Sequence, residues 1–139
     1  MEKVAVLTSG GVDSSILLVD MAKRSRAFPL YLRVGMAWED QEQRALEAFI
    51  AAVGEPNMQP VTVLTLPIEP FYGDHWGVRG VGAPKAGTAE SGLFLPGRNV
   101  LLLSLAAVWC ATHDVALIAI GSLAGNPFPD ATPEFFESF

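Results

Sequence analysis

The feature that most constrains this chain is the alternation of short apolar segments with longer segments of helical periodicity. Residues 3–8 are apolar without alternation, which is typical of a strand buried on both faces of a parallel sheet. Residues 40–53 instead gather their apolar side chains on one helical face, and Gly54 follows as a C-cap. This order predicts βαβ units, and hence an α/β fold with a doubly wound parallel sheet. We expect strands at 3–8, 28–34, 61–66 and 115–120, and helices at 14–25, 40–53 and 97–112.

Length and composition favour one globular domain over residues 1–139. Half of the residues are apolar and 17% are charged, which suffices for a sizeable core. The net charge of −6 argues against nucleic-acid or anionic-membrane partners. Residues 100–120 are long and apolar enough for a membrane-spanning segment. Because Thr112, His113 and Asp114 interrupt them, we instead expect a helix, a turn and a strand. Without an evident targeting segment, we expect a cytoplasmic protein.

The strongest chemical signal is the segment Ser9-Gly10-Gly11-Val12-Asp13-Ser14-Ser15, which follows the first strand and opens the first helix. The two glycines allow the backbone to approach an anion, and the N–H groups of the helix start favour one. Asp13 would repel a bare phosphate, which points to a divalent cation or to a capping role. The alternative is an ordinary strand-to-helix turn with serine caps.

This segment resembles the PP-loop of the N-type ATP pyrophosphatases. The resemblance implies an adenine-nucleotide α-hydrolase-type sheet, with the first strand central, the second and third on one side and the fourth on the other. It places the site in the crevice between the first and fourth strands, and Asp13 as a catalytic residue and a ligand of Mg²⁺. The residues expected to bind ATP are Thr8, Ser9, Gly10, Gly11, Val12, Asp13, Ser14, Ser15, Val34 and Gly35.

A second signal is Leu95-Pro96-Gly97-Arg98-Asn99, which precedes the third helix. A cation at a helix N-terminus is unfavourable unless an anion binds there, so Arg98 suggests a phosphate or carboxylate partner. An exposed arginine beside an asparagine cap is the alternative. Residues 94–111 and the later Phe-Pro-Asp segment are similar to the 7-cyano-7-deazaguanine synthases. The substrate residues that this resemblance implies are Gly97, Arg98 (also as a catalytic residue), Asn99, Asp130 and Glu134.

The resemblance implies an ATP-dependent, AMP-forming ligase of queuosine biosynthesis, which converts 7-carboxy-7-deazaguanine and ammonia to the nitrile. The family usually has Tyr-Pro-Asp-Cys-Arg where residues 128–132 are Phe-Pro-Asp-Ala-Thr. This departure leaves open another PP-loop amidotransferase, ligase or thiolation enzyme. The family also binds zinc through a cysteine cluster, whereas this sequence has one cysteine, Cys110, which we expect in the core. A non-catalytic nucleotide-binding module of a larger assembly therefore also remains open.

Two further segments lead to expectations about order and completeness. Residues 67–96 lack clear periodicity and are expected to form a long flexible loop. Thr132-Pro133-Glu134 is a helix start, and Phe135, Phe136 and Phe139 form its apolar face. Because a domain rarely ends on exposed phenylalanines, we expect a C-terminally short chain that is inactive alone, or a homodimer or partner that covers this face.

Overall fold

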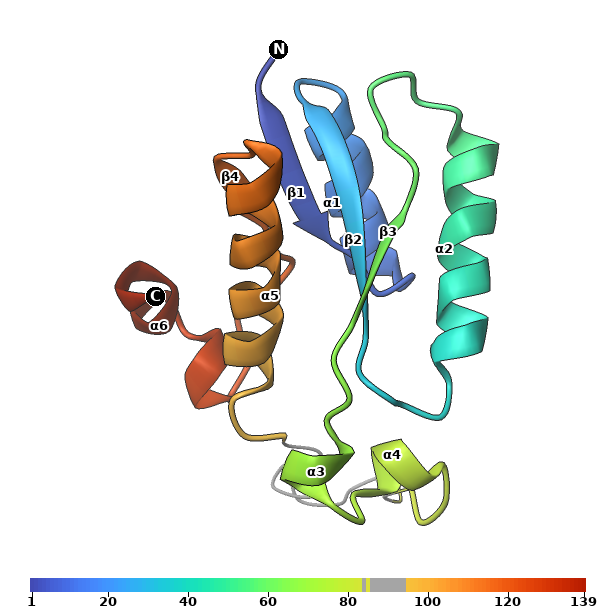
Figure 1. Ribbon diagram of the computed structural model, residues 1–139, viewed down its shortest axis with the longest axis vertical. Coiled ribbons are helices and arrows are strands. Elements are labelled where there is room, and N and C mark those ends of the chain that lie inside the picture. The colour runs from blue at the N-terminus through green and yellow to red at the C-terminus, as the bar shows by residue number, and fades with distance from the viewer. Residues whose placement is uncertain (84, 86–94) are drawn as a thin grey trace.

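The protein folds around a parallel sheet, seen here in a computed structural model that describes residues 1–83, 85 and 95–139 (Figure 1). The order of the described strands is β3-β2-β1-β4, and every pairing is parallel. This confirms the expected α/β fold with the first strand central. The strands are β1 (Lys3–Leu7), β2 (Arg26–Arg33), β3 (Thr62–Thr65) and β4 (Leu117–Ala119).

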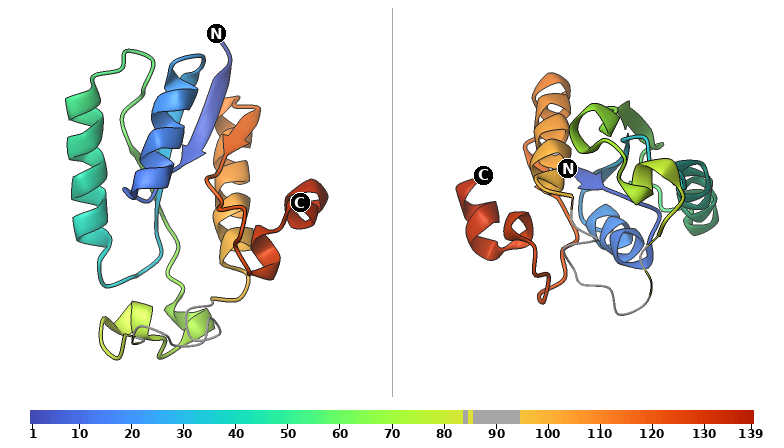
Figure 2. Two further views of the ribbon diagram at one scale, coloured as in Figure 1. Left: turned by 180° about the vertical axis from the view of Figure 1, so that it is seen from behind. Right: turned by 90° about the horizontal axis from the view of Figure 1, so that it is seen from below.

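Helices cover both faces of the sheet, which is the doubly wound arrangement. Figure 2 shows α1 (Val12–Ala22) and α2 (Glu39–Val53) on one face and α5 (Arg98–His113) on the other. Gly54 caps α2 in the left-handed region, at φ 61°, and its N–H donates to the carbonyl of Ile50. The α1 helix begins two residues before the expected start because the backbone becomes helical directly after the glycine pair.

Two apolar clusters explain why β1 lacks polar alternation. Val4 and Val6 pack with Leu18 of α1 and Leu46 of α2 on one face. Ala5 and Leu7 pack with Leu103, Trp109 and Cys110 of α5 on the other. Successive side chains of a strand point to opposite faces, so a strand covered on both sides is apolar throughout. Cys110 is 5% exposed, as expected for a core residue, and burial raises the pKa of its thiol.

The apolar stretch 100–120 divides into a helix, a turn and a strand, as expected. Asp114 ends α5 in the left-handed conformation, at φ 55°, and β4 begins three residues later. No described helix has both the length and the apolar character needed to cross a membrane.

The segment between β3 and α5 contains more regular structure than we expected. Two one-turn helices, α3 (Glu69–Tyr72) and α4 (Trp76–Arg79), lie beyond the carboxyl ends of the strands (Figure 1). Each is followed by a glycine that accepts a positive φ, at Gly73 and Gly80. Residues 84 and 86–94, which belong to the predicted loop, lie outside the described residues.

The last helix, α6 (Pro133–Ser138), starts where the sequence predicts, because the Thr132 hydroxyl accepts the N–H of Phe135 at 3.1 Å. Two of its phenylalanines are less exposed than we expected. Phe135 and Phe136 pack against the α5 side of the core, whereas Phe139 is 54% exposed. Docking of α6 on the core therefore covers part of the predicted apolar face.

Candidate functional site

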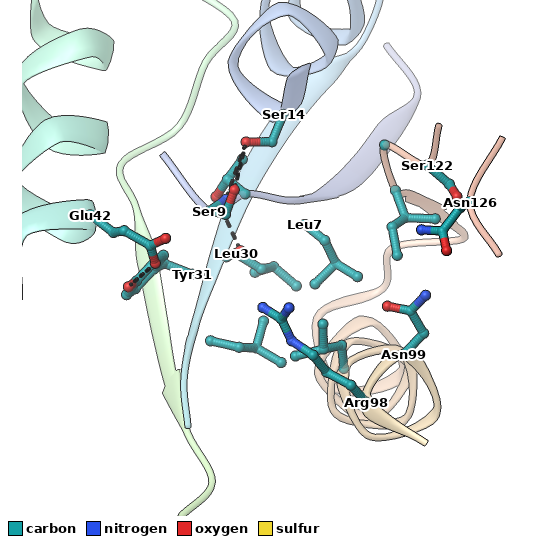
Figure 3. Close-up of a pocket in the computed structure, with 15 residues that line it drawn as sticks. Leu7, Ser9, Ser14, Leu30, Tyr31, Glu42, Arg98, Asn99, Ser122 and Asn126 are labelled. Carbon is teal, nitrogen blue, oxygen red and sulfur yellow. Dashed lines mark hydrogen bonds between the residues drawn. The ribbon is translucent and has the colours of Figure 1, made fainter. Parts of the chain in front are cut away.

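A pocket of about 260 Å³ lies at the carboxyl ends of β1, β2 and β4 (Figure 3). This is the edge where the strand order reverses, since β1 is followed by β2 on one side while β4 lies on the other. Ligands of open α/β sheets bind in such crevices. The residues that line the pocket are Leu7, Thr8, Ser9, Ser14, Leu30, Tyr31, Leu32, Glu42, Arg98, Asn99, Leu102, Ile120, Gly121, Ser122 and Asn126.

The serines of the glycine loop hold the loop in its bend and face the pocket. The Ser14 hydroxyl lies 3.3 Å from that of Ser9, accepts the N–H of Ser9 and donates to the carbonyl of Gly11. The Ser9 hydroxyl also accepts the N–H of Gly11, at 3.3 Å. The loop is thus shaped by the same hydroxyl groups that we expected to bind phosphate.

Gly10 is the one position in the loop where only glycine fits. Its φ is +77°, and a Cβ atom built there would lie 2.7 Å from the backbone carbonyl of Glu42. The loop therefore packs directly against α2, which fixes the position of the Ser9 hydroxyl relative to that helix. Side chains other than hydrogen would have to displace the backbone of α2.

Other residues of the motif point elsewhere. Val12 and Asp13 are exposed on the first turn of α1, and Ser15 is buried on the side of α1 that faces α2. Thr8 is buried, and both its N–H and its hydroxyl donate to the carbonyl of Leu30. The structure therefore brings Thr8, Ser9 and Ser14 to the pocket, whereas Asp13 is not among the described residues that line it.

The start of α5 provides the cationic wall of the pocket. Arg98 reaches from the first turn toward the loop serines, and Asn99 lies beside Asn126 (Figure 3). Gly97 precedes this turn with a φ of +72°. One anion at this helix N-terminus belongs to the protein itself, because the carboxylate of Asp130 accepts the N–H of Asn99 at 2.8 Å.

Asp130 is therefore a cap of α5 donated from a distant part of the chain. It is 8% exposed, and its backbone carbonyl also accepts the side-chain amide of Asn99 at 2.8 Å. A carboxylate at a helix N-terminus is stabilised by the helix dipole. Because this anion already satisfies the helix end, the guanidinium of Arg98 is left to face the pocket. Glu134 is exposed in the first turn of α6 and is not among the described residues that line the pocket.

The backbone expected to meet adenine is engaged by a buried carboxylate. The N–H groups of Val34 and Gly35 both donate to Oε1 of Glu39, at 2.5 and 2.9 Å, and the Val34 carbonyl accepts the N–H of Ile68. Glu39 is 4% exposed, and Nε of Arg33 lies 3.7 Å from Oε2 of Glu39. These hydrogen bonds fix the turn after β2.

The neighbouring aromatic residues pack on one another. Met36 is 8% exposed, the N–H of Ala37 donates to the carbonyl of Gly77, and the rings of Trp38 and Trp76 lie 5.5 Å apart. In the described structure, these side chains therefore pack within the loop. This packing ties the turn after β2 to α4.

Sequence reasoning missed several residues that line the pocket. Ser122 and Asn126 follow the carboxyl end of β4, so their position after an expected strand at the switch point was the available signal. Glu42 gave no such signal, because the sequence alone does not distinguish a pocket-lining glutamate from a solvent-exposed one on an amphipathic helix. Tyr31 gave none either. The structure joins them, since the Tyr31 hydroxyl donates to Oε2 of Glu42 at 3.0 Å.

The electrostatics of this pair follow from its burial. Burial raises the pKa of the Glu42 carboxyl, while the hydrogen bond from Tyr31 and the charge of Arg98 lower it. Burial, followed by the hydrogen bond to Glu42, raises the pKa of the Tyr31 hydroxyl. The pocket therefore holds one cation and one desolvated carboxylate on different walls. Within the described ranges, no three His, Cys, Asp or Glu side chains come together as a metal-binding group.

Comparison with known proteins identifies the family. The family model described as "Queuosine biosynthesis protein QueC" matches residues 3–139. The chain is 30% identical to 7-cyano-7-deazaguanine synthase 1 of Desulfitobacterium hafniense over 98% of its own length, and 29% identical to the 7-cyano-7-deazaguanine synthase of Coxiella burnetii over all of it. In both comparisons it spans 62% of the relative's length.

A solved structure shows the same fold. It is the crystal structure of a predicted subunit of tRNA methyltransferase from Methanocaldococcus jannaschii, with a TM-score of 0.60 and 16% identity over 99% of this chain and 62% of that one. Since the identity is low, this likeness concerns the fold. The family match, which extends over nearly every residue, shows that the chain belongs to the QueC family of queuosine biosynthesis proteins.

Proposed function

We propose that the chain supplies the ATP and substrate site of an AMP-forming ligase that converts 7-carboxy-7-deazaguanine and ammonia to 7-cyano-7-deazaguanine. The observation that carries this proposal is the pocket that joins the Ser9 and Ser14 hydroxyls to Arg98 at the switch point. The names of the relatives supply the product, and the family resemblance implies the acid as the substrate. We place the enzyme in the cytoplasm, where ATP and deazaguanine precursors are available.

The glycine loop is the proposed site of the pyrophosphate group. Gly11 is the N-cap of α1 and makes no side-chain cap hydrogen bond, so the first N–H groups of the helix are suited to an anion. The Ser9 and Ser14 hydroxyls add donors at the same place. Asp13, exposed on the first turn of α1, is the carboxylate that would hold Mg²⁺ together with the phosphates, which is the usual way proteins bind this ion.

The chemistry assigned to the site is adenylation of a carboxylate. An oxygen of the substrate carboxylate attacks the α-phosphorus of ATP, the bond to the β-phosphate breaks, and pyrophosphate leaves. Ammonia then attacks the acyl carbon, AMP departs with one carboxylate oxygen, and the surplus proton passes to solvent. The amide oxygen then attacks the α-phosphorus of a second ATP, and pyrophosphate leaves again. Departure of AMP with that oxygen, together with loss of the two nitrogen-bound protons to solvent, leaves the nitrile.

Arg98 is suited to the charge that this sequence creates. A guanidinium stabilises developing negative charge on the carboxylate and the α-phosphate, and it cannot lose its proton under physiological conditions. Asp130 acts through it, because the cap on α5 fixes the turn that carries Arg98. The remaining contribution is positioning, for which an apolar floor of Leu7, Leu30 and Ile120 is suited to a flat ring.

The Ala131-Thr132 pair in place of the family's Cys-Arg favours a second candidate, an AMP-forming PP-loop ligase that acts on another carboxylate. A nucleotide-binding module without catalysis is the third. AMP release from ATP and ammonium, with and without 7-carboxy-7-deazaguanine, separates them. The proposal requires release that depends on the acid, whereas release with other acids alone supports the second and binding of ATP without any AMP supports the third.

Two variants test the residues in the same assay. Ser9→Ala and Arg98→Ala are each expected to lower AMP formation by roughly 100-fold, because each removes a donor to developing charge. Ser104→Ala and Arg44→Ala are the matched controls, since both side chains are exposed outside the pocket. Equal activity of the site variants and the controls would remove the residues from the proposed site.

A further inference from the structure

One carboxylate lies in a pocket that is otherwise suited to anions. Figure 3 shows Glu42 on the wall opposite Asn99 and Asn126, with Arg98 between them. A carboxylate beside a phosphate-binding loop repels the phosphates, so its presence there needs a separate explanation. The proposed adenylation chemistry assigns it no step.

Glu42 is held firmly in place. Its carboxylate accepts the hydroxyl of Tyr31, which is 2% exposed, and its backbone carbonyl would lie 2.7 Å from a Cβ atom built on Gly10. The side chain is thus held to β2 by Tyr31, while the backbone of Glu42 packs against the glycine loop. An ionised carboxylate has about four acceptor positions, and Tyr31 and the nearby Trp38 indole occupy two of them at most.

The remaining acceptor positions suit a ligand with two adjacent N–H donors. The edge of a deazaguanine ring has this pattern, because its ring N–H and its exocyclic amino group lie side by side. The corresponding edge of adenine pairs an amino group with a ring nitrogen whose lone pair would face the carboxylate. The deazaguanine acid also has a carboxylate on its five-membered ring, away from these donors, and Arg98 is the complementary charge.

We propose that Glu42 binds the ring N–H and amino group of the deazaguanine substrate, while Arg98 takes its carboxylate. The two side chains would bind opposite ends of the substrate, and the apolar floor of the pocket would lie against its ring. Glu42 is then the residue that selects a guanine-type ring. This inference rests on the proposed function, because the acid is the substrate named there.

The test compares two ligands on two proteins. The ligands are 7-carboxy-7-deazaguanine and the analogue that lacks the exocyclic amino group, and the readouts are the dissociation constant by calorimetry and acid-dependent AMP formation. In Glu42→Gln, affinity for the deazaguanine acid should fall by about 10- to 100-fold, because one hydrogen bond to a charged group is lost and an amide N–H₂ faces a donor. Affinity for the analogue should change by less than about 3-fold, and affinity for ATP should not change.

Controls separate substrate binding from folding. Glu47→Gln changes an exposed glutamate of the same helix and should leave both ligands unaffected. Glu42→Asp keeps the charge and shortens the side chain, so a selective loss for the deazaguanine acid is expected even if the glutamine variant folds poorly. Urea unfolding of each variant verifies the fold before binding is measured.

The outcomes are distinguishable. Equal losses for the acid and the analogue would overturn the inference, since Glu42 would then act only on the fold. A loss of ATP affinity instead would assign Glu42 to the adenine and also overturn it. If the unaltered protein binds ATP but neither binds the acid nor forms AMP with it, the proposed function fails and this inference fails with it.

Discussion

The cap that Asp130 places on α5 can be tested through its contribution to stability. Asp130→Ala removes the acceptor of the Asn99 N–H, a bond of 2.8 Å at a position that is 8% exposed. Loss of a helix cap costs about 1 kcal/mol, and loss of a carboxylate from the dipole of a helix N-terminus adds about 0.5 kcal/mol. We therefore expect the free energy of unfolding to fall by roughly 1.5 kcal/mol.

Urea unfolding followed by far-ultraviolet circular dichroism measures this directly. With an m-value of about 2 kcal/mol/M, the midpoint of Asp130→Ala should fall by about 0.8 M. Asp130→Asn keeps an acceptor oxygen and loses the charge, so it should lose only about 0.5 kcal/mol. Glu137→Ala, an exposed acid on α6, should stay within about 0.5 kcal/mol of the unaltered protein. An unchanged midpoint for Asp130→Ala would refute the cap, and equal losses for the Ala and Asn variants would refute the role of the acceptor.

Three further predictions concern the walls of the pocket. Glu39→Ala leaves the N–H groups of Val34 and Gly35 without their acceptor, so unfolding in urea should show a loss of about 2 to 3 kcal/mol, and a loss under about 0.5 kcal/mol would contradict the bonds described. Tyr31→Phe should cost about 1 kcal/mol in the same assay, and an equally stable variant would mean that the hydroxyl contributes nothing. Burial raises the pKa of Glu42 above its ordinary value near 4.5, so the folded protein holds a proton that the unfolded chain has lost. Stability relative to Glu42→Gln should therefore fall as the pH rises from that value through the raised pKa, and a pH-independent difference would contradict the shift.

Much of the sheet could be predicted because its signals are local. The apolar runs of β1 and β2 and the periodicity of α2 follow from burial on two faces or on one. The position of the glycine loop after β1 placed Ser9 and Ser14 at the carboxyl edge of the sheet. The α3 and α4 helices were missed because one turn is too short to show periodicity.

The parts of the site that were missed depend on tertiary contacts between distant residues. Asp130 was expected beside substrate, which stays a prediction, and the structure adds a role that no local pattern shows, because Asp130 caps a helix that begins 32 positions earlier. The anionic partner expected for Arg98 stays a prediction, while Asp130 places a carboxylate of the protein itself at the same helix N-terminus. Nothing in the local pattern around Glu42 distinguishes it from the exposed Glu47. The difference arises in the folded structure, where the buried Tyr31 hydroxyl donates a hydrogen bond to Glu42.

The central claim is that this pocket adenylates the carboxylate of a deazaguanine. Exchange of labelled pyrophosphate into ATP tests that step alone, because it requires reversible formation of the acyl adenylate and no ammonia. The account predicts exchange that depends on 7-carboxy-7-deazaguanine and is lost in Ser9→Ala and Arg98→Ala. Bound ATP and bound acid without exchange, or exchange that proceeds equally without the acid, would contradict it.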